Sequence, residues 1–66
     1  MEEKERLRIV LKHLIEHNEG HTEDYKRWVD LARNSEMEKA AKLIEEASDH
    51  VEKAGKALKK ALDLLG

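Results

Sequence analysis

Three of the four histidines in this 66-residue chain lie four residues apart, at His13, His17 and His21. In an α-helix, residues four apart lie one above another on the same face, with about 5–6 Å between their Cβ atoms. A continuous helix through this stretch would therefore align three imidazoles. The chain has no cysteine, so any metal site must be built from nitrogen and oxygen ligands.

The fourth histidine, His50, is far away in the sequence, but we expect folding to bring it to a level between His17 and His21. Two histidines at i and i+4, with a third from a neighbouring helix, match the ligand geometry of zinc and related divalent sites. Zinc, nickel and cobalt are the metals that we expect for such a site. The remaining ligand could be any of the following: His13, Glu46, Asp49, water or a residue from a second chain.

Polar neighbours could support these ligands. Glu16 and Asp24 are candidate acceptors that would orient the imidazoles, and Glu46 and Asp49 lie near His50. With an antiparallel fold, the middle of the core would hold a polar layer made of Asn18, His21, Ser48 and His50. Such a layer costs stability unless its groups pair with one another, with water or with a metal. This cost favours a metal site over solvated, incidental histidines.

The composition is typical of long helices, because the chain has no proline, three glycines and many Ala, Leu, Glu and Lys residues. Steps of three and four residues predict an apolar stripe in the first half, through Leu7, Leu11, Leu14, Asn18, His21, Tyr25, Trp28 and Ala32. A second stripe runs through Met37, Ala41, Ile44, Ser48, Val51, Gly55, Leu58, Leu62 and Leu65. Between them, Asn34 is predicted to take a left-handed cap, and Ser35 with Glu38 to form a capping box.

Residues 1–66 are thus predicted to form a single all-α domain, an antiparallel helical hairpin that is possibly kinked at Gly20. A lone hairpin cannot cover all of its apolar residues, so we expect it to dimerise into a four-helix bundle. The alternative is a true break at Gly20, with Thr22 starting a new helix in a three-helix bundle.

Charged residues make up 42% of the chain, yet the formal net charge is only -2 and no basic block occurs. This argues against nucleic-acid binding. No apolar run approaches the roughly 20 residues of a membrane span, so we expect a soluble, cytoplasmic protein. No serine or histidine arrangement suggests nucleophilic catalysis, and no substrate pocket is recognisable, so we do not expect an enzyme.

The segment from Leu11 to His21, followed by Tyr25 and Arg27-Trp28, resembles the signature of a family of small uncharacterised helical proteins from archaea and anaerobic bacteria. That signature reads His-x-x-Glu-His-Asn-x-x-His, an aromatic residue, then Arg-x-Trp, and this chain departs from its last element because it has Lys26-Arg27-Trp28. The likeness covers the first half of the chain, and the family has no settled function. It implies a ligand set with its support among these shared residues: His13, Glu16, His17, Asn18 and His21. His50 lies outside the pattern.

The sequence therefore predicts a small metal-binding helical protein for metal storage, delivery or sensing. The alternative is a helical interaction or oligomerisation module in which the histidines are incidental.

Overall fold

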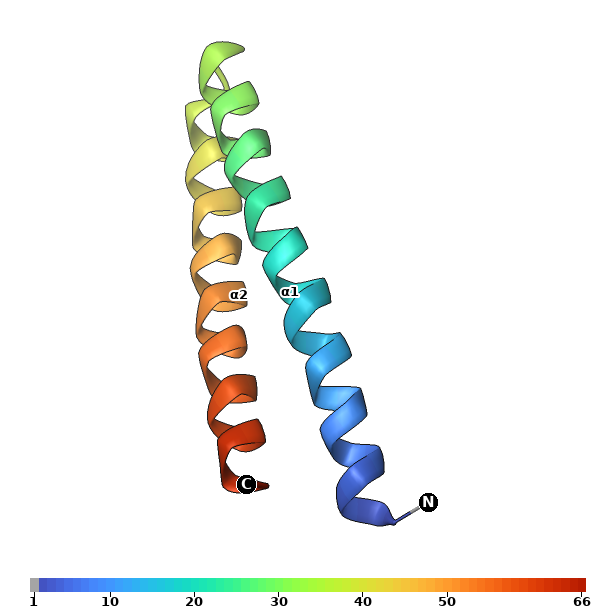
Figure 1. The fold of residues 1–66 in the computed structure, drawn as a ribbon. Coiled ribbons are helices and arrows are strands. Elements are labelled where there is room, and N and C mark those ends of the chain that lie inside the picture. The colour runs from blue at the N-terminus through green and yellow to red at the C-terminus, as the bar shows by residue number, and fades with distance from the viewer. Residues whose placement is uncertain (1) are drawn as a thin grey trace.

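The computed structural model describes residues 2–66, which form two helices, α1 (Glu3–Asn34) and α2 (Glu38–Leu64). They pack antiparallel as a hairpin about 51 Å long, with the start of α1 and the end of α2 at the end away from the turn (Figure 1). Glu3 and Glu5 lie in the first turn of α1, where carboxylates favour the helix dipole. The predicted all-α hairpin is confirmed. Within the described residues, neither helix has an apolar stretch long enough to cross a membrane.

α1 continues through Gly20 without interruption. Thr22 does not begin a new helix, because its Oγ1 donates a hydrogen bond to the carbonyl oxygen of Asn18 one turn earlier (3.1 Å). The alternative of a three-helix bundle with a break at Gly20 is therefore wrong.

The turn is a Schellman motif. The N–H of Met37 donates to the carbonyl oxygen of Ala32 (2.8 Å), and the N–H of Glu36 donates to that of Arg33 (3.1 Å). Glu36 lies in the left-handed region with φ 60°. This closes α1 and reverses the chain within three residues.

Two details of the predicted turn are wrong. The left-handed residue is Glu36 and not Asn34, which is the last residue of α1. The N-cap of α2 is Met37, with no side-chain capping bond, so Ser35 and Glu38 form no capping box. Backbone hydrogen bonds of the Schellman motif take the place of the expected side-chain caps.

The seam between the helices, called the hairpin seam below, follows the predicted stripe in α2 but not in α1. On α1 the seam consists of Arg8, Leu11, Ile15, Asn18, Thr22, Tyr25, Val29 and Ala32. The predicted stripe shares every second member of this row. The other members of the predicted stripe each lie one residue before a seam residue and are exposed; these are Leu7, Leu14, His21 and Trp28.

The hairpin seam is packed most tightly near the turn. Val29, Ala32 and the fully buried Ala41 form its core, with Ile44 against them. The helices diverge towards their other ends (Figure 1). There the Arg8 guanidinium bridges the gap, because its Nη2 donates to the carbonyl oxygens of the last two residues at 3.0 and 3.1 Å.

A polar layer does lie in the middle of the seam, but the histidines are not part of it. Asn18 donates from Nδ2 to the carbonyl oxygen of Val51 (2.8 Å), and Ser48 is buried nearby. Gly55 provides the space, because a Cβ there would lie 2.6 Å from Nδ2 of Asn18. None of the buried side-chain nitrogen or oxygen atoms within residues 2–66 lacks a hydrogen-bond partner. The seam therefore satisfies its polar groups without a metal.

Candidate functional site

His17 and His21 lie in direct contact on the exposed surface of α1. Their Nε2 atoms are 2.8 Å apart, and the rings meet edge to face with centroids 4.3 Å apart. The ring of Tyr25 extends the row one turn further, with its centroid 6.3 Å from that of His21 and the planes nearly parallel. Unbroken helix through Gly20 produces this alignment, since four-residue spacing keeps all three rings on one side.

The pair has the geometry of a chelate. In the absence of a metal, one Nε2 must carry a hydrogen and donate it to the other. Two nitrogens bound tetrahedrally to one zinc ion at about 2.0–2.1 Å would lie roughly 3.3 Å apart. A small rotation of the two side chains covers the difference from the observed 2.8 Å. His17 and His21 can therefore supply two ligands to one ion with no change in the backbone.

The other two histidines do not join this pair within one chain. His13 lies one turn before His17 but lines a separate shallow hollow with Ile9, Lys12 and Glu16, and His50 is exposed on α2. Within residues 2–66, no group of three or more His, Asp or Glu side chains is close enough together to hold a metal ion. One chain thus assembles two of the four predicted ligands.

The supporting residues predicted from the sequence are also dispersed. Asp24 forms an ion pair with Arg27, and Asn18 is engaged in the hairpin seam. Glu46 and Asp49 are exposed on α2, and Asp49 lines a hollow on the side that carries Glu45 and Glu52. None of these residues contacts the pair in the structure as described.

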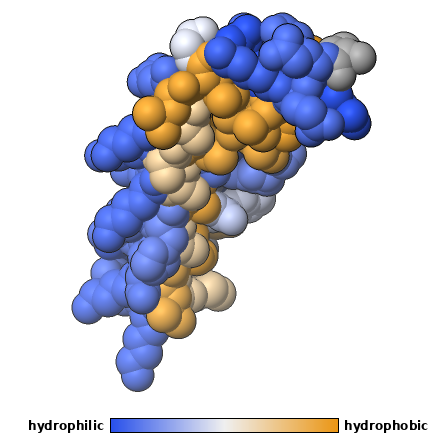
Figure 2. All heavy atoms as spheres, turned by 90° about the horizontal axis from the view of Figure 1, so that it is seen from below, coloured by the Kyte–Doolittle hydropathy of each residue, from blue (hydrophilic) through white to orange (hydrophobic). Residues whose placement is uncertain are grey.

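The histidine pair lies within a band of exposed apolar side chains that both helices share, called the apolar face below. From α1 it comprises Leu7, Val10, Leu14, His17, His21, Asp24, Trp28 and Leu31. From α2 it comprises Ala40, Leu43, Ala47, His50, Ala54, Ala57, Ala61 and Leu64. Trp28, Leu31 and Ala40 line one hollow near the turn, so both rows lie on the same side of the hairpin. Figure 2, which views the hairpin from its open end, shows hydrophobic side chains gathered beside and between hydrophilic ones.

Charge is almost absent from the apolar face, although charged residues make up 42% of the chain. Its α2 row contains none, and its α1 row contains only Asp24. Trp28 and Leu31 are more than half exposed, at 54% and 55%. Large contiguous apolar surfaces of this kind mark sites of association. This face was not predicted as a unit from the sequence, and the signal that could have revealed it is the absence of Lys, Arg and Glu at these spacings.

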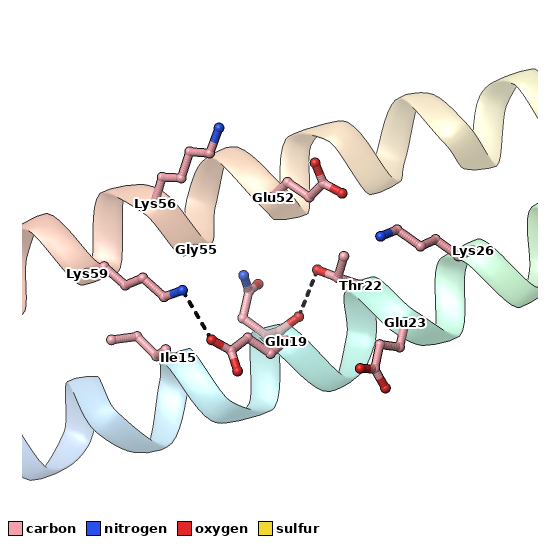
Figure 3. Close-up of a pocket in the computed structure, with 10 residues that line it drawn as sticks. Ile15, Glu19, Thr22, Glu23, Lys26, Glu52, Gly55, Lys56 and Lys59 are labelled. Carbon is pink, nitrogen blue, oxygen red and sulfur yellow. Dashed lines mark hydrogen bonds and ion pairs between the residues drawn. The ribbon is translucent and has the colours of Figure 1, made fainter.

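The opposite side of the hairpin is charged. Lys59 Nζ lies 3.2 Å from Glu19 Oε1, and Arg33 Nη2 lies 2.6 Å from Glu45 Oε2. The hydrogen bond from Arg33 to Glu45 raises the pKa of the guanidinium, which remains charged at all physiological pH values. Figure 3 shows the open cleft of about 400 Å³ on this side, where the Lys59–Glu19 pair bridges the helices beside Gly55. Such exposed pairs contribute little stability, so this side is a solvated surface.

Comparison with known protein families matches residues 7–65 to a family described as a domain of unknown function (DUF8180). No curated protein matches the chain. No solved structure matches it either.

Proposed function

The chain belongs to this domain family, and we propose that it binds a divalent transition metal through His17 and His21 as a homodimer. The two hairpins form a four-helix bundle, and the protein serves in metal storage, delivery or sensing in the cytoplasm rather than in catalysis. Zinc, nickel and cobalt suit imidazole ligands.

The observation that carries the metal proposal is the 2.8 Å contact between the two Nε2 atoms. A hydrogen bond holds the two nitrogens together in the metal-free chain, and the same convergence of two imidazole nitrogens is what a chelate requires. Both rings are exposed, so an ion can reach them without unfolding of the helix.

The apolar face supports the dimer. A chain of this size buries only a small core on its own, and the buried apolar residues here are Leu11, Val29, Ala32 and Ala41. A second hairpin packed on the apolar face would bury the exposed leucines, valine and tryptophan that a monomer leaves in water. The alanine row of α2 would let that hairpin approach closely.

The test is thermal unfolding of untagged protein with and without zinc, nickel or cobalt salts. Binding at a metal concentration one hundred times Kd adds about 2.7 kcal/mol to the free energy of unfolding, so Tm should rise by several degrees. His17→Ala and His21→Ala should each abolish the rise. His13→Ala is the matched control, because His13 lies away from the pair, and it should leave the rise intact.

The same titration repeated at lower pH adds a second readout. A metal ion binds only the deprotonated imidazole nitrogen, so affinity should fall steeply below about pH 6. Affinity that is unchanged between pH 7.5 and 5 would contradict imidazole ligation.

A second candidate function, a helical interaction module with incidental histidines, is favoured by the apolar face alone. It predicts self-association or partner binding with no change in Tm for any metal. The unfolding experiment therefore separates the two functions.

A further inference from the structure

The α1 part of the apolar face is symmetric about Glu19. Its members follow steps of three and four residues in both directions from that point, with His17 and His21 innermost. The outermost members on both sides are large and apolar: Leu7 and Val10 on one side, Trp28 and Leu31 on the other. The point of symmetry lies near the middle of α1, which spans Glu3–Asn34.

A second copy of α1, laid antiparallel on the first with a two-fold axis at the level of Glu19, therefore sets histidines level with histidines at the centre and large apolar residues level with one another at both ends. Between them, Leu14 lies level with Asp24 of the second copy, a residue whose carboxylate is paired with Arg27 of its own chain. Leu7 lies level with Leu31 of the second copy, and Val10 lies level with its Trp28. His17 lies level with His21 of the second copy, and the reverse pair follows by symmetry. This is the self-complementary contact that a two-fold dimer requires.

This register brings four imidazoles together at one point. Each chain contributes a pair whose Nε2 atoms already converge, and the two pairs face each other across the axis. Four nitrogen ligands from two helices, two from each, suit the tetrahedral coordination of zinc. The single chain assembles only two ligands, so the site is incomplete without the second copy.

Resting on the proposed function, we propose that the metal site is shared between two chains, with His17 and His21 of each copy binding one ion on the two-fold axis of an antiparallel α1–α1 pairing. The surrounding apolar residues exclude water from the ion. Without the metal, facing imidazole pairs would be buried with incomplete hydrogen bonding, which opposes association. Metal binding and dimerisation are therefore coupled.

The other two-fold arrangement places both turns at the same end, so that α1 packs on α2 of the second copy. Because Asn18 lies level with Val51 and Gly55, this arrangement would set His21 close to the level of the second copy's His50. It would leave His17 against the alanines of α2. In that arrangement His50 could be a ligand and His17 could not. In the antiparallel arrangement both members of the observed pair are ligands.

Two measurements on one preparation test the proposal: the number of zinc ions bound per chain, and the orientation of the two chains in the dimer. Calorimetric titration with zinc should give one ion per two chains. A spin label at Asn34→Cys, on the exposed last residue of α1 in a chain without cysteines, measures orientation by electron-electron resonance. Asn34 lies 15 residues from Glu19, so the antiparallel dimer separates the two labels by about 45 Å at 1.5 Å per residue. With both turns at one end, the labels would lie within about 30 Å, since packed helices lie 8–10 Å apart.

The histidine variants complete the test. His17→Ala and His21→Ala should each remove half of the ligands and weaken zinc binding by at least tenfold, whereas His50→Ala should leave affinity and stoichiometry unchanged. One zinc per chain, or a short label distance with loss of binding in His50→Ala, would overturn the shared site while leaving the proposed metal-binding function intact. No zinc binding by the wild-type chain would overturn both.

Discussion

At the scale of single residues, polar side chains at neighbouring positions on α1 have different roles. One is used by the packing of the hairpin, and the others remain exposed. Asn18 points into the hairpin seam and is satisfied there by the carbonyl of Val51. His17, one residue earlier, and His21, three residues later, lie outside the seam and contact only each other and Tyr25 among the rings. The polar group that the fold needs is thus the amide, and the imidazoles are left free to bind a ligand.

The contact between Asn18 and Gly55 leads to a prediction about stability. Gly55→Ala raises helix propensity by about 1 kcal/mol, but the new Cβ would lie 2.6 Å from Nδ2 of Asn18 and displace it. Loss of that hydrogen bond costs about 0.5–1.5 kcal/mol. We expect Gly55→Ala to change stability by no more than about 0.5 kcal/mol in the wild-type chain, because the two effects nearly cancel. In an Asn18→Ala background we expect it to be stabilising by roughly 0.5–1 kcal/mol.

Urea denaturation of the four chains in this double-mutant cycle measures the coupling. Gly20→Ala is the control for propensity alone, because nothing lies within 4 Å of a Cβ there. Equal effects of Gly55→Ala in both backgrounds would show that the glycine does not accommodate the asparagine.

At the scale of elements, α1 carries two apolar stripes that share the row Leu11, Asn18, Tyr25 and Ala32. One stripe is the α1 side of the hairpin seam, and the other is the stripe predicted from the sequence, whose remaining members Leu7, Leu14, His21 and Trp28 belong to the apolar face. The hydrophobic period predicts the helix and its length, but it does not say which stripe packs on α2. The exposed Leu7, Leu14 and Trp28 are as apolar as the seam residues Ile15 and Val29, which is why the predicted seam was one residue out of register. α2 has alanines beside its seam, so its stripe was predicted correctly.

The same ambiguity determined how much of the site could be predicted. The alignment of His17 with His21 follows from four-residue spacing in one helix, and the two rings are in contact in the structure. The convergence of His21 with His50 depended on placing His21 in the seam, where Thr22 lies instead. A shift of one residue on a helix rotates a side chain by about 100°, so this part of the prediction required tertiary information.

The turn offers a prediction at the same scale. Glu36 has φ 60°, a left-handed conformation that costs an L-residue about 1–2 kcal/mol and that glycine adopts freely. We expect Glu36→Gly to stabilise the hairpin by about 0.5–1 kcal/mol, less than the full conformational cost because glycine also loses more entropy on folding. Ser35→Gly is the control, since φ at Ser35 is -96° and glycine gains nothing there. Chemical denaturation of both variants provides the comparison, and a destabilised Glu36→Gly would contradict the left-handed turn.

At the scale of the whole molecule, the hairpin is two-sided. One long side carries ion pairs that cross between the helices, and the other carries the apolar face with the histidine pair at its middle. A hairpin that functioned alone would gain solubility from charges on both sides. Concentrating the charge on one side leaves the other for the second hairpin that we propose, and the proposed metal site would lie where two such sides meet.

Leu43→Glu tests this interpretation directly. Leu43 belongs to the apolar face and is 66% exposed in the single chain, where replacing it should change stability by no more than about 0.5 kcal/mol. In the proposed dimer the same carboxylate would be buried among apolar side chains without a partner. The free-energy cost of that burial is several times the cost of the substitution in the single chain. We therefore expect Leu43→Glu to weaken dimerisation by at least tenfold, measured by sedimentation equilibrium, and to remove any dependence of Tm on protein concentration. His13→Glu makes the same change in charge outside the apolar face and should dimerise as the wild type does. Equal dimerisation of the two variants would show that the apolar face is not the surface that joins the chains.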